Sequence, residues 1–198
     1  MRKLLLFGIF LLFSSCLQAQ IYTAGSSENP QVSLPRWEFS GAWVGAFSRL
    51  EDRAHYEMAN HQTGWNARLL YYLSSSWAIG VEGTWFGSER FSRVSQYEVR
   101  QWGALVKWVP AQESFLHSYL ALGGGIRSFE LDYTFRWKEK DASPFYWVGL
   151  GMDIYVCTSI FVGAEARIKY HAEQETGAFY HLDSHWEPEV SFRAGIRF

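Results

Sequence analysis

The sequence lacks the long apolar run that a membrane-spanning helix requires. After residue 20 no stretch of roughly 18 or more apolar residues occurs, and about 20 are needed to cross a bilayer as a helix. Only two cysteines are present among the 198 residues, so a small domain stapled by several disulfides is excluded. The formal net charge is only -2, which gives no reason to expect a nucleic-acid partner.

Aromatic residues, by contrast, are abundant. They make up 18% of the chain, and ten of them are tryptophans. Such an excess is expected where side chains must lie at the interface between a membrane and water. The alternative reading of the composition is an aromatic-rich soluble β-sandwich.

Residues 1–19 have the features of an export signal. Two basic residues precede an apolar stretch from Leu4 to Phe13, and small polar residues follow it. This stretch is too short to span a membrane, and we expect cleavage after Ala19. The segment that ends at Cys16 loosely resembles a lipoprotein box, so lipidation of this cysteine is an alternative.

The chain after the signal divides into a lead-in, residues 20–36, and a segment of alternating residues, 37–198. Apolar and polar residues alternate with a period of two in this segment, which predicts β-strands. The connections are alternately short and long, as in outer-membrane barrels with short periplasmic turns and longer external loops. We therefore predict an all-β fold, an eight-stranded antiparallel up-and-down transmembrane β-barrel. Its strands are expected near residues 37–49, 61–73, 77–87, 97–109, 115–126, 145–156, 160–170 and 187–198.

Charged residues on the inward faces predict specific partners. Folding the second and third strands about residues 74–76 sets Arg68 opposite Glu82 and Trp65 opposite Trp85. A hairpin of the last two strands pairs Arg167 with Glu189 and Lys169 with Glu187. Because the interior of an eight-stranded barrel is just wide enough for side chains, these residues predict an ion-paired plug rather than a conducting pore.

Two segments carry a family resemblance. In the last strand, apolar residues from Val190 onward alternate with polar ones and end on Phe198, and residues 119–125 read Tyr-Leu-Ala-Leu-Gly-Gly-Gly. On these marks the chain resembles the small eight-stranded outer-membrane proteins, such as the opacity proteins, OmpX and the OmpA transmembrane domain. The resemblance implies a place in the cell outer membrane among its lipid and lipopolysaccharide. It also implies that the barrel-assembly machinery reads Phe198 and its strand.

The segment between the fifth and sixth strands continues to alternate. A turn around Phe135 would pair Glu130 with Lys140 and Asp132 with Lys138 on one face. The other face would then carry an aromatic stripe of Phe129, Leu131, Tyr133, Phe135 and Trp137. Exposed apolar stripes and sheet edges are contact sites for proteins or membranes, so we predict a protruding hairpin that binds a surface. The alternative is that the stripe packs on neighbouring loops.

A polar cluster is expected above the last two strands. Extending their register outward sets His171, Glu173 and Glu175 against His185, Asp183 and His181. Imidazoles and carboxylates in this arrangement could bind zinc or copper, or change their pairing near the His pKa. With Ser184 they could also form a hydrolase site, since lipid A deacylases and acyltransferases are small barrels. The motif spacing of neither family is present, so no catalytic residue, metal ligand or cofactor is assigned.

Together these features predict an outer-membrane β-barrel whose lumen is plugged by ion pairs. Its external loops would make surface contacts, in adhesion, protection or envelope integrity, with an external protein or another surface ligand. The alternative is a barrel enzyme that modifies lipid A or phospholipid in the outer leaflet. A soluble, lipocalin-like barrel is disfavoured, because the outward faces are too apolar and aromatic for water.

Overall fold

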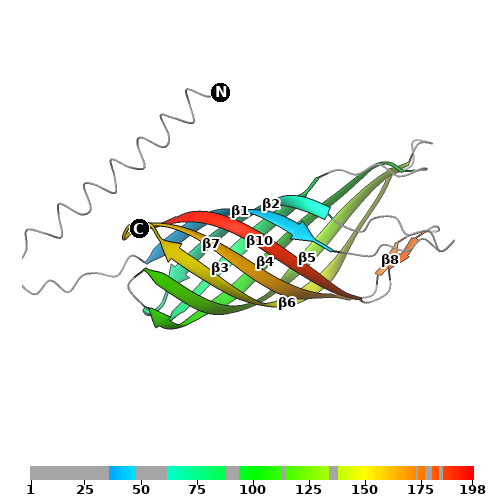
Figure 1. Ribbon diagram of the computed structural model, residues 1–198. Helices are drawn as coiled ribbons and strands as arrows, with labels where there is room; N and C mark the ends of the chain where they lie inside the picture. The colour runs from blue at the N-terminus through cyan, green and yellow to red at the C-terminus, as the bar shows by residue number, and fades with distance from the viewer. Residues whose placement is uncertain are drawn as a thin grey trace, which may run out of the picture.

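The computed structural model describes residues 36–47, 62–87, 94–112, 115–133, 138–172, 174–176, 180–182 and 185–198. The predicted signal and most of the lead-in lie outside these residues. Eight long strands close into one barrel in the order β1-β10-β7-β6-β5-β4-β3-β2 (Figure 1). These strands are β1 (Trp37–Ala46), β2 (Gln62–Tyr72), β3 (Trp77–Phe86), β4 (Val94–Gln112), β5 (Leu116–Tyr133), β6 (Lys138–Tyr155), β7 (Ile160–His171) and β10 (His185–Arg197).

The alternation in the sequence becomes an inside-out distribution of polarity. On β10, Val190 and Phe192 are exposed on the outside of the barrel, whereas Glu189 and Arg193 are buried within it. All neighbouring strands of the barrel are antiparallel. An apolar exterior around a polar interior is the arrangement that a transmembrane β-barrel requires, and the predicted fold class is confirmed. Among the described residues, no helix is long and apolar enough to cross a membrane.

The predicted registers are confirmed. Trp65 lies opposite Trp85 and Arg68 opposite Glu82 on β2 and β3. On β7 and β10, Arg167 lies opposite Glu189, and the same ladder continues outward to the pair of His171 and His185. Register is well specified in such a barrel, because a slip of one residue would turn every charge toward lipid.

Strands β4, β5 and β6 are longer than predicted. The fifth strand was expected to end near Ile126 and the sixth to begin at Phe145, with a separate hairpin between them, but β5 and β6 stay paired without a break up to Asp132 and Lys138. Figure 1 shows this part of the wall extending beyond the other strands at one end of the barrel. The predicted hairpin is therefore the continuation of the barrel wall. Near the same end, β8 (Gln174–Thr176) and β9 (Tyr180–Leu182) pair as a small two-stranded sheet.

The opposite end of the barrel holds the short turns and both ends of the described barrel chain. The backbone of Trp37 exchanges two hydrogen bonds with that of Phe198, at 2.9 and 2.8 Å, so the first and last strands close the barrel there. The turns between β2 and β3 and between β6 and β7 lie at this end and contain only four residues each, 73–76 and 156–159. By the rule for outer-membrane barrels, this is the periplasmic end.

Aromatic rings mark two levels on the outside of the barrel. At the periplasmic level Trp77 stacks on Trp108, with ring centroids 6.0 Å apart. At the outer level Trp85 meets Trp102 edge-on at 5.0 Å. Beyond Trp102 the outward positions of β4 become charged, starting with Arg100 and Glu98, whose side chains form an ion pair of 3.0 Å. The apolar band between the two levels is therefore the surface that faces lipid, and the long strands extend above it.

Candidate functional site

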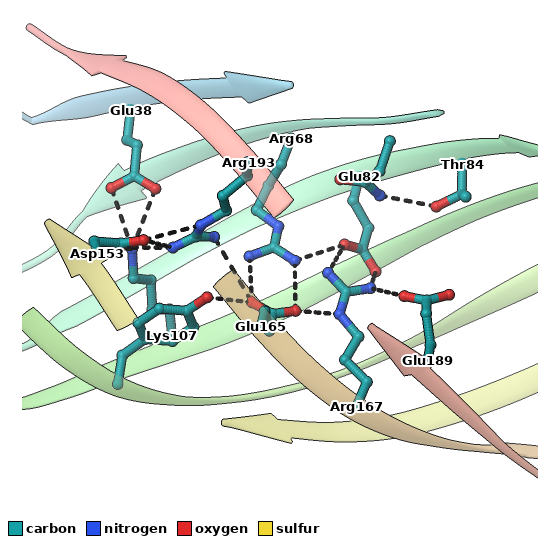
Figure 2. Close-up of polar contacts among 12 residues, drawn as sticks. Glu38, Arg68, Glu82, Thr84, Lys107, Asp153, Glu165, Arg167, Glu189 and Arg193 are labelled. Atoms are coloured by element: carbon teal, nitrogen blue, oxygen red, sulfur yellow. Dashed lines mark hydrogen bonds and ion pairs between the residues drawn. The ribbon is translucent and has the colours of Figure 1, made fainter. Parts of the chain in front are cut away.

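The interior of the barrel is filled with charged side chains. Among the described residues, seven buried cationic side chains face six buried carboxylates, an excess of one positive charge. Figure 2 shows most of them linked along the barrel axis. Every inward charge predicted from the alternation is among them. The set comprises Arg68, Lys107, Arg127, Arg167, Lys169, Arg193 and Arg197, with Glu38, Glu82, Asp153, Glu165, Glu187 and Glu189.

The periplasmic half of this network is centred on Lys107. Its Nζ lies 3.2 Å from Glu38 Oε1 and 2.9 Å from Asp153 Oδ2, and so joins β1 to β6 across the lumen. Asp153 in turn accepts hydrogen bonds from Arg193, with Nη2 at 2.6 Å. Glu38 also accepts a 2.6 Å hydrogen bond from the hydroxyl of Tyr72. Each carboxylate thus has two or more donors, which a buried charge requires.

Glu165 is the centre of the middle layer. Both of its oxygens accept hydrogen bonds from Arg68 at 3.0 Å, and Oε2 accepts a 2.6 Å bond from the hydroxyl of Tyr119. The Nε of Arg167 also donates to it. Arg68 and Arg167 both continue to Glu82, at 3.1 and 2.9 Å. The predicted pair of Arg68 and Glu82 is therefore present, as one edge of a larger network.

The outer layer differs from the prediction in one pair. Arg167 lies 3.4 Å from Glu189, as predicted. Lys169, however, contacts Glu189 and donates to Gln101 Oε1 at 2.6 Å, although Glu187 is directly opposite in the register. Lys169 and Glu187 are thus opposite each other as predicted, but the ion pair predicted between them is replaced by that of Lys169 with Glu189. Residues two apart on a strand share a face, so a flexible lysine can reach the diagonal carboxylate instead of the one directly opposite.

Aromatic rings fill the space between the charges. The guanidinium of Arg167 lies 4.0 Å from the ring centroid of Trp147, and that of Arg197 lies 3.6 Å from Tyr72. Lys107 Nζ lies 4.5 Å from the ring centroid of Tyr119. Cations over ring faces are stabilised, and large rings leave little room for water. Ion pairs and rings together form a plug along the described part of the lumen.

At the outer mouth the structure brings together three residues above this plug. His171 and His185 are opposite each other on β7 and β10, with stacked rings 5.0 Å apart. Glu187 joins them, with Oε1 3.5 Å from Nε2 of His171. The sequence prediction had included both histidines but assigned Glu187 to Lys169. Its position two residues after His185 on the same strand face is the signal in the sequence from which this neighbourhood could have been predicted.

The remaining members of the predicted mouth cluster are placed only in part. Glu175 and His181 are opposite each other in the β8–β9 ladder, in agreement with the extended register. Glu173, Asp183 and Ser184 lie outside the described residues. The hydrolase alternative therefore stays a prediction from the sequence.

The protruding hairpin has the predicted pairing but a different orientation. Glu130 lies opposite Lys140, and their side chains form an ion pair of 3.1 Å on the outer face. Phe129 is only 4% exposed, with the guanidinium of Arg127 at 4.9 Å from its ring centroid. It continues the inward face of β5, so its assignment to an exposed stripe was wrong. Leu131 and Tyr133 follow it on β5, and Phe135 and Trp137 lie outside the described residues.

The outer face of this extended wall is hollowed just above the aromatic level. A depression of about 550 Å³ is lined by Arg100 and Glu98 from β4, Glu130 from β5 and Lys140 from β6. Arg100 pairs with Glu98, and Lys140 pairs with Glu130. The side chains of Arg100 and Lys140 are 56% and 68% exposed. This face therefore offers both signs of charge to whatever lies above the membrane.

Comparison with known proteins agrees with the fold. The sequence matches no family model and no curated protein. Neisserial surface protein A has a similar fold, with a TM-score of 0.62 and 13% identity over 82% of this chain and 97% of that one. OprG from Pseudomonas aeruginosa has a TM-score of 0.56 and 12% identity over 83% of this chain and 97% of that one. Ail, the attachment invasion locus protein of Yersinia pestis, has a TM-score of 0.54 and 14% identity over 83% of this chain and 99% of that one. Ail has also been solved in complex with the heparin analogue sucrose octasulfate. This chain therefore has the fold of the small eight-stranded outer-membrane β-barrels.

Proposed function

We propose that this protein resides in the cell outer membrane and acts at its external end, where the extended wall of β4, β5 and β6 makes surface contacts. The role would be in adhesion, protection or envelope integrity. The observation that carries the proposal is the filled lumen, because a plugged barrel of this size offers no path for solutes. What it presents to the exterior is its extended wall and loops.

The wall itself supports a binding role. Above the aromatic level its outward face is polar, with Lys140 68% exposed in its side chain. The ladder between β5 and β6 continues above that level as far as the pair of Asp132 and Lys138. Residues 133–137, called the hairpin tip, come between this pair in the chain. Sites carried on paired strands are held more precisely than sites on long loops. Ail, of similar fold, is by name an attachment protein and binds a heparin analogue, which is consistent with a surface ligand here.

The proposal includes the route to the membrane. Residues 1–19 would direct export and be cleaved, and the barrel-assembly machinery would read Phe198 at the end of β10. Phe198 is exposed on the outside of the barrel and paired with Trp37, so an assembly factor could reach it before the barrel closes. Once inserted, the barrel would contact outer-membrane lipid and, in the outer leaflet, lipopolysaccharide.

Removing the aromatic side chains of the hairpin tip should abolish surface contact without preventing assembly. We expect the variant Tyr133→Ser/Phe135→Ser/Trp137→Ser to reduce attachment of expressing cells to a cell monolayer to the level of cells without the protein. The reason is that, in the proposed contact, these three aromatic side chains are the anchors, and a few aromatic anchors dominate most binding interfaces. The measurement is a count of attached cells at equal amounts of folded protein in the outer membrane.

The matched control is Phe115→Ser, which removes an exposed aromatic side chain at the periplasmic end of the barrel. This variant should attach like the wild type. Unchanged attachment of the triple variant would contradict the proposed role of the hairpin. Wild-type cells that attach no better than cells lacking the protein would contradict adhesion itself.

A further inference from the structure

The three residues at the outer mouth have the composition of a zinc site. One ligand atom from each of His171, His185 and Glu187 can be chosen so that all three atoms lie within 4.8 Å of one another. Two imidazoles and one carboxylate, with a fourth position left for water, form a common ligand set for zinc in proteins. Imidazole nitrogen also disfavours the hard cations Ca²⁺ and Mg²⁺, which prefer oxygen ligands.

The burial of two of these residues is costly without a ligand. His171 is 2% exposed and Glu187 1% exposed. Both ring nitrogens of His171 and both carboxylate oxygens of Glu187 are buried and have no hydrogen-bond partner among the described residues. The nearest cation to Glu187 is Arg127, whose Nη1 lies 3.9 Å from Oε2. The protein therefore leaves ligand atoms of both residues buried without a hydrogen bond, which calls for a partner such as an ion.

The backbone holds the three side chains in place for a common ligand. His171 and His185 are directly opposite each other on β7 and β10, and Glu187 follows on the same inward face of β10. The atoms Nε2 of His171 and Oε1 of Glu187 are 3.5 Å apart. Ligand atoms of a tetrahedral zinc site lie about 3.3 Å apart, given bonds of about 2.0–2.1 Å. One edge of the tetrahedron is therefore already close to the required length.

His185 supplies the third ligand and lies on the path by which an ion would reach the site. It is the first residue of β10 and is partly exposed, whereas the other two residues are buried beneath it. A rotation of its side chain would bring its nitrogen toward the other two ligand atoms. An ion arriving from the exterior would meet this histidine first.

The neighbouring cations each contact a group other than Glu187. Lys169 is engaged by Glu189 and Gln101, and the guanidinium of Arg127 lies over the ring of Phe129. Glu187 therefore remains as the carboxylate available to a metal ion at the mouth. From this geometry we infer that His171, His185 and Glu187 bind one Zn²⁺, with the fourth coordination position open toward the exterior. The inference stands whether or not the protein acts in adhesion.

The test is a calorimetric titration of ZnCl₂ into the purified, folded barrel in detergent. We expect one saturable site in the wild type and a loss of at least about tenfold in affinity in each of His171→Ala, His185→Ala and Glu187→Gln. His117→Ala is the matched control, because it removes a histidine from the periplasmic end of β5 and should bind zinc like the wild type. CaCl₂ should give no binding.

Two further measurements keep the test decisive. Each variant is titrated only if it shows the heat-modifiable electrophoretic mobility of a folded barrel, and Glu187→Gln preserves the shape of the side chain it replaces. Binding of Co²⁺ in place of zinc should give the visible absorption of a tetrahedral complex, and this absorption should be lost in His171→Ala. The inference is overturned if the wild type shows no saturable site. It is equally overturned if His171→Ala and Glu187→Gln bind zinc as the wild type does.

Discussion

Replacing Glu165 by alanine is expected to destabilise the barrel by about 3–5 kcal/mol, the usual cost of breaking a buried ion pair from one side. Glu165 is 3% exposed and receives donors from Arg68, Arg167 and Tyr119. Its removal would leave buried guanidinium groups without this acceptor, in a lumen where the cations already exceed the carboxylates by one. The measurement is the free energy of unfolding, from urea titration of the barrel in lipid vesicles.

The control is Glu130→Ala, which removes the same side chain from an ion pair on the outside. Glu130 pairs with Lys140 at 3.1 Å, but the Lys140 side chain is 68% exposed. Exposed pairs contribute about 0–1 kcal/mol, so this variant should be nearly as stable as the wild type. If Glu165→Ala were no more destabilising than Glu130→Ala, the lumen network would not hold the barrel together.

Introducing a methyl group at Gly151 is expected to cost about 3 kcal/mol, from overpacking together with a lost charge-assisted hydrogen bond. Gly151 on β6 lies opposite Tyr119 on β5, and a Cβ atom there would overlap the phenol ring. The ring would have to leave its position and give up its 2.6 Å hydrogen bond to Glu165. Glycine at this position therefore makes room for the aromatic part of the plug.

Urea unfolding also measures this effect, with Gly41→Ala as the control. At Gly41 the nearest atom to a new Cβ would be the carbonyl oxygen of Asn66, at 4.0 Å, so alanine is accommodated there. In a Tyr119→Ala background, Gly151→Ala should cost little, because the overlapping ring is gone. A Gly151→Ala variant that is as stable as the wild type, or equally destabilised with and without the Tyr119 ring, would contradict this explanation.

The pairing of adjacent strands could be predicted from the sequence because the period of two fixes both faces at once. Arg68 opposite Glu82 follows from alternation about a short turn. His171 opposite His185 follows from extending the register that pairs Arg167 with Glu189. β5 and β6 extend further than predicted, because the alternation continues above the membrane through the segment predicted as a separate hairpin. There the outward residues turn from apolar to charged without a break in the strands.

Contacts across the lumen could not be predicted. Arg68 on β2 and Glu165 on β7 are not neighbours in the sheet, and they meet only because the barrel closes. The same holds for Lys107 with Glu38 and Asp153. The exchange of Glu187 for Glu189 as the partner of Lys169 depends on side-chain reach rather than on register. Because Lys169 pairs with Glu189, Glu187 lies with His171 and His185 at the mouth. The sequence therefore predicted the two histidines of this cluster but not its carboxylate.

The measurement that tests the plugged lumen most directly is the electrical conductance of the purified barrel in a planar lipid bilayer. Insertion is verified first, by protease protection of the same protein in vesicles. A lumen filled by ion pairs and aromatic rings predicts no stepwise increase in current over the bare bilayer, whereas a porin in the same bilayer gives clear steps. Reproducible single-channel steps from the wild-type barrel would contradict the plug and the assignment of function to the outer end.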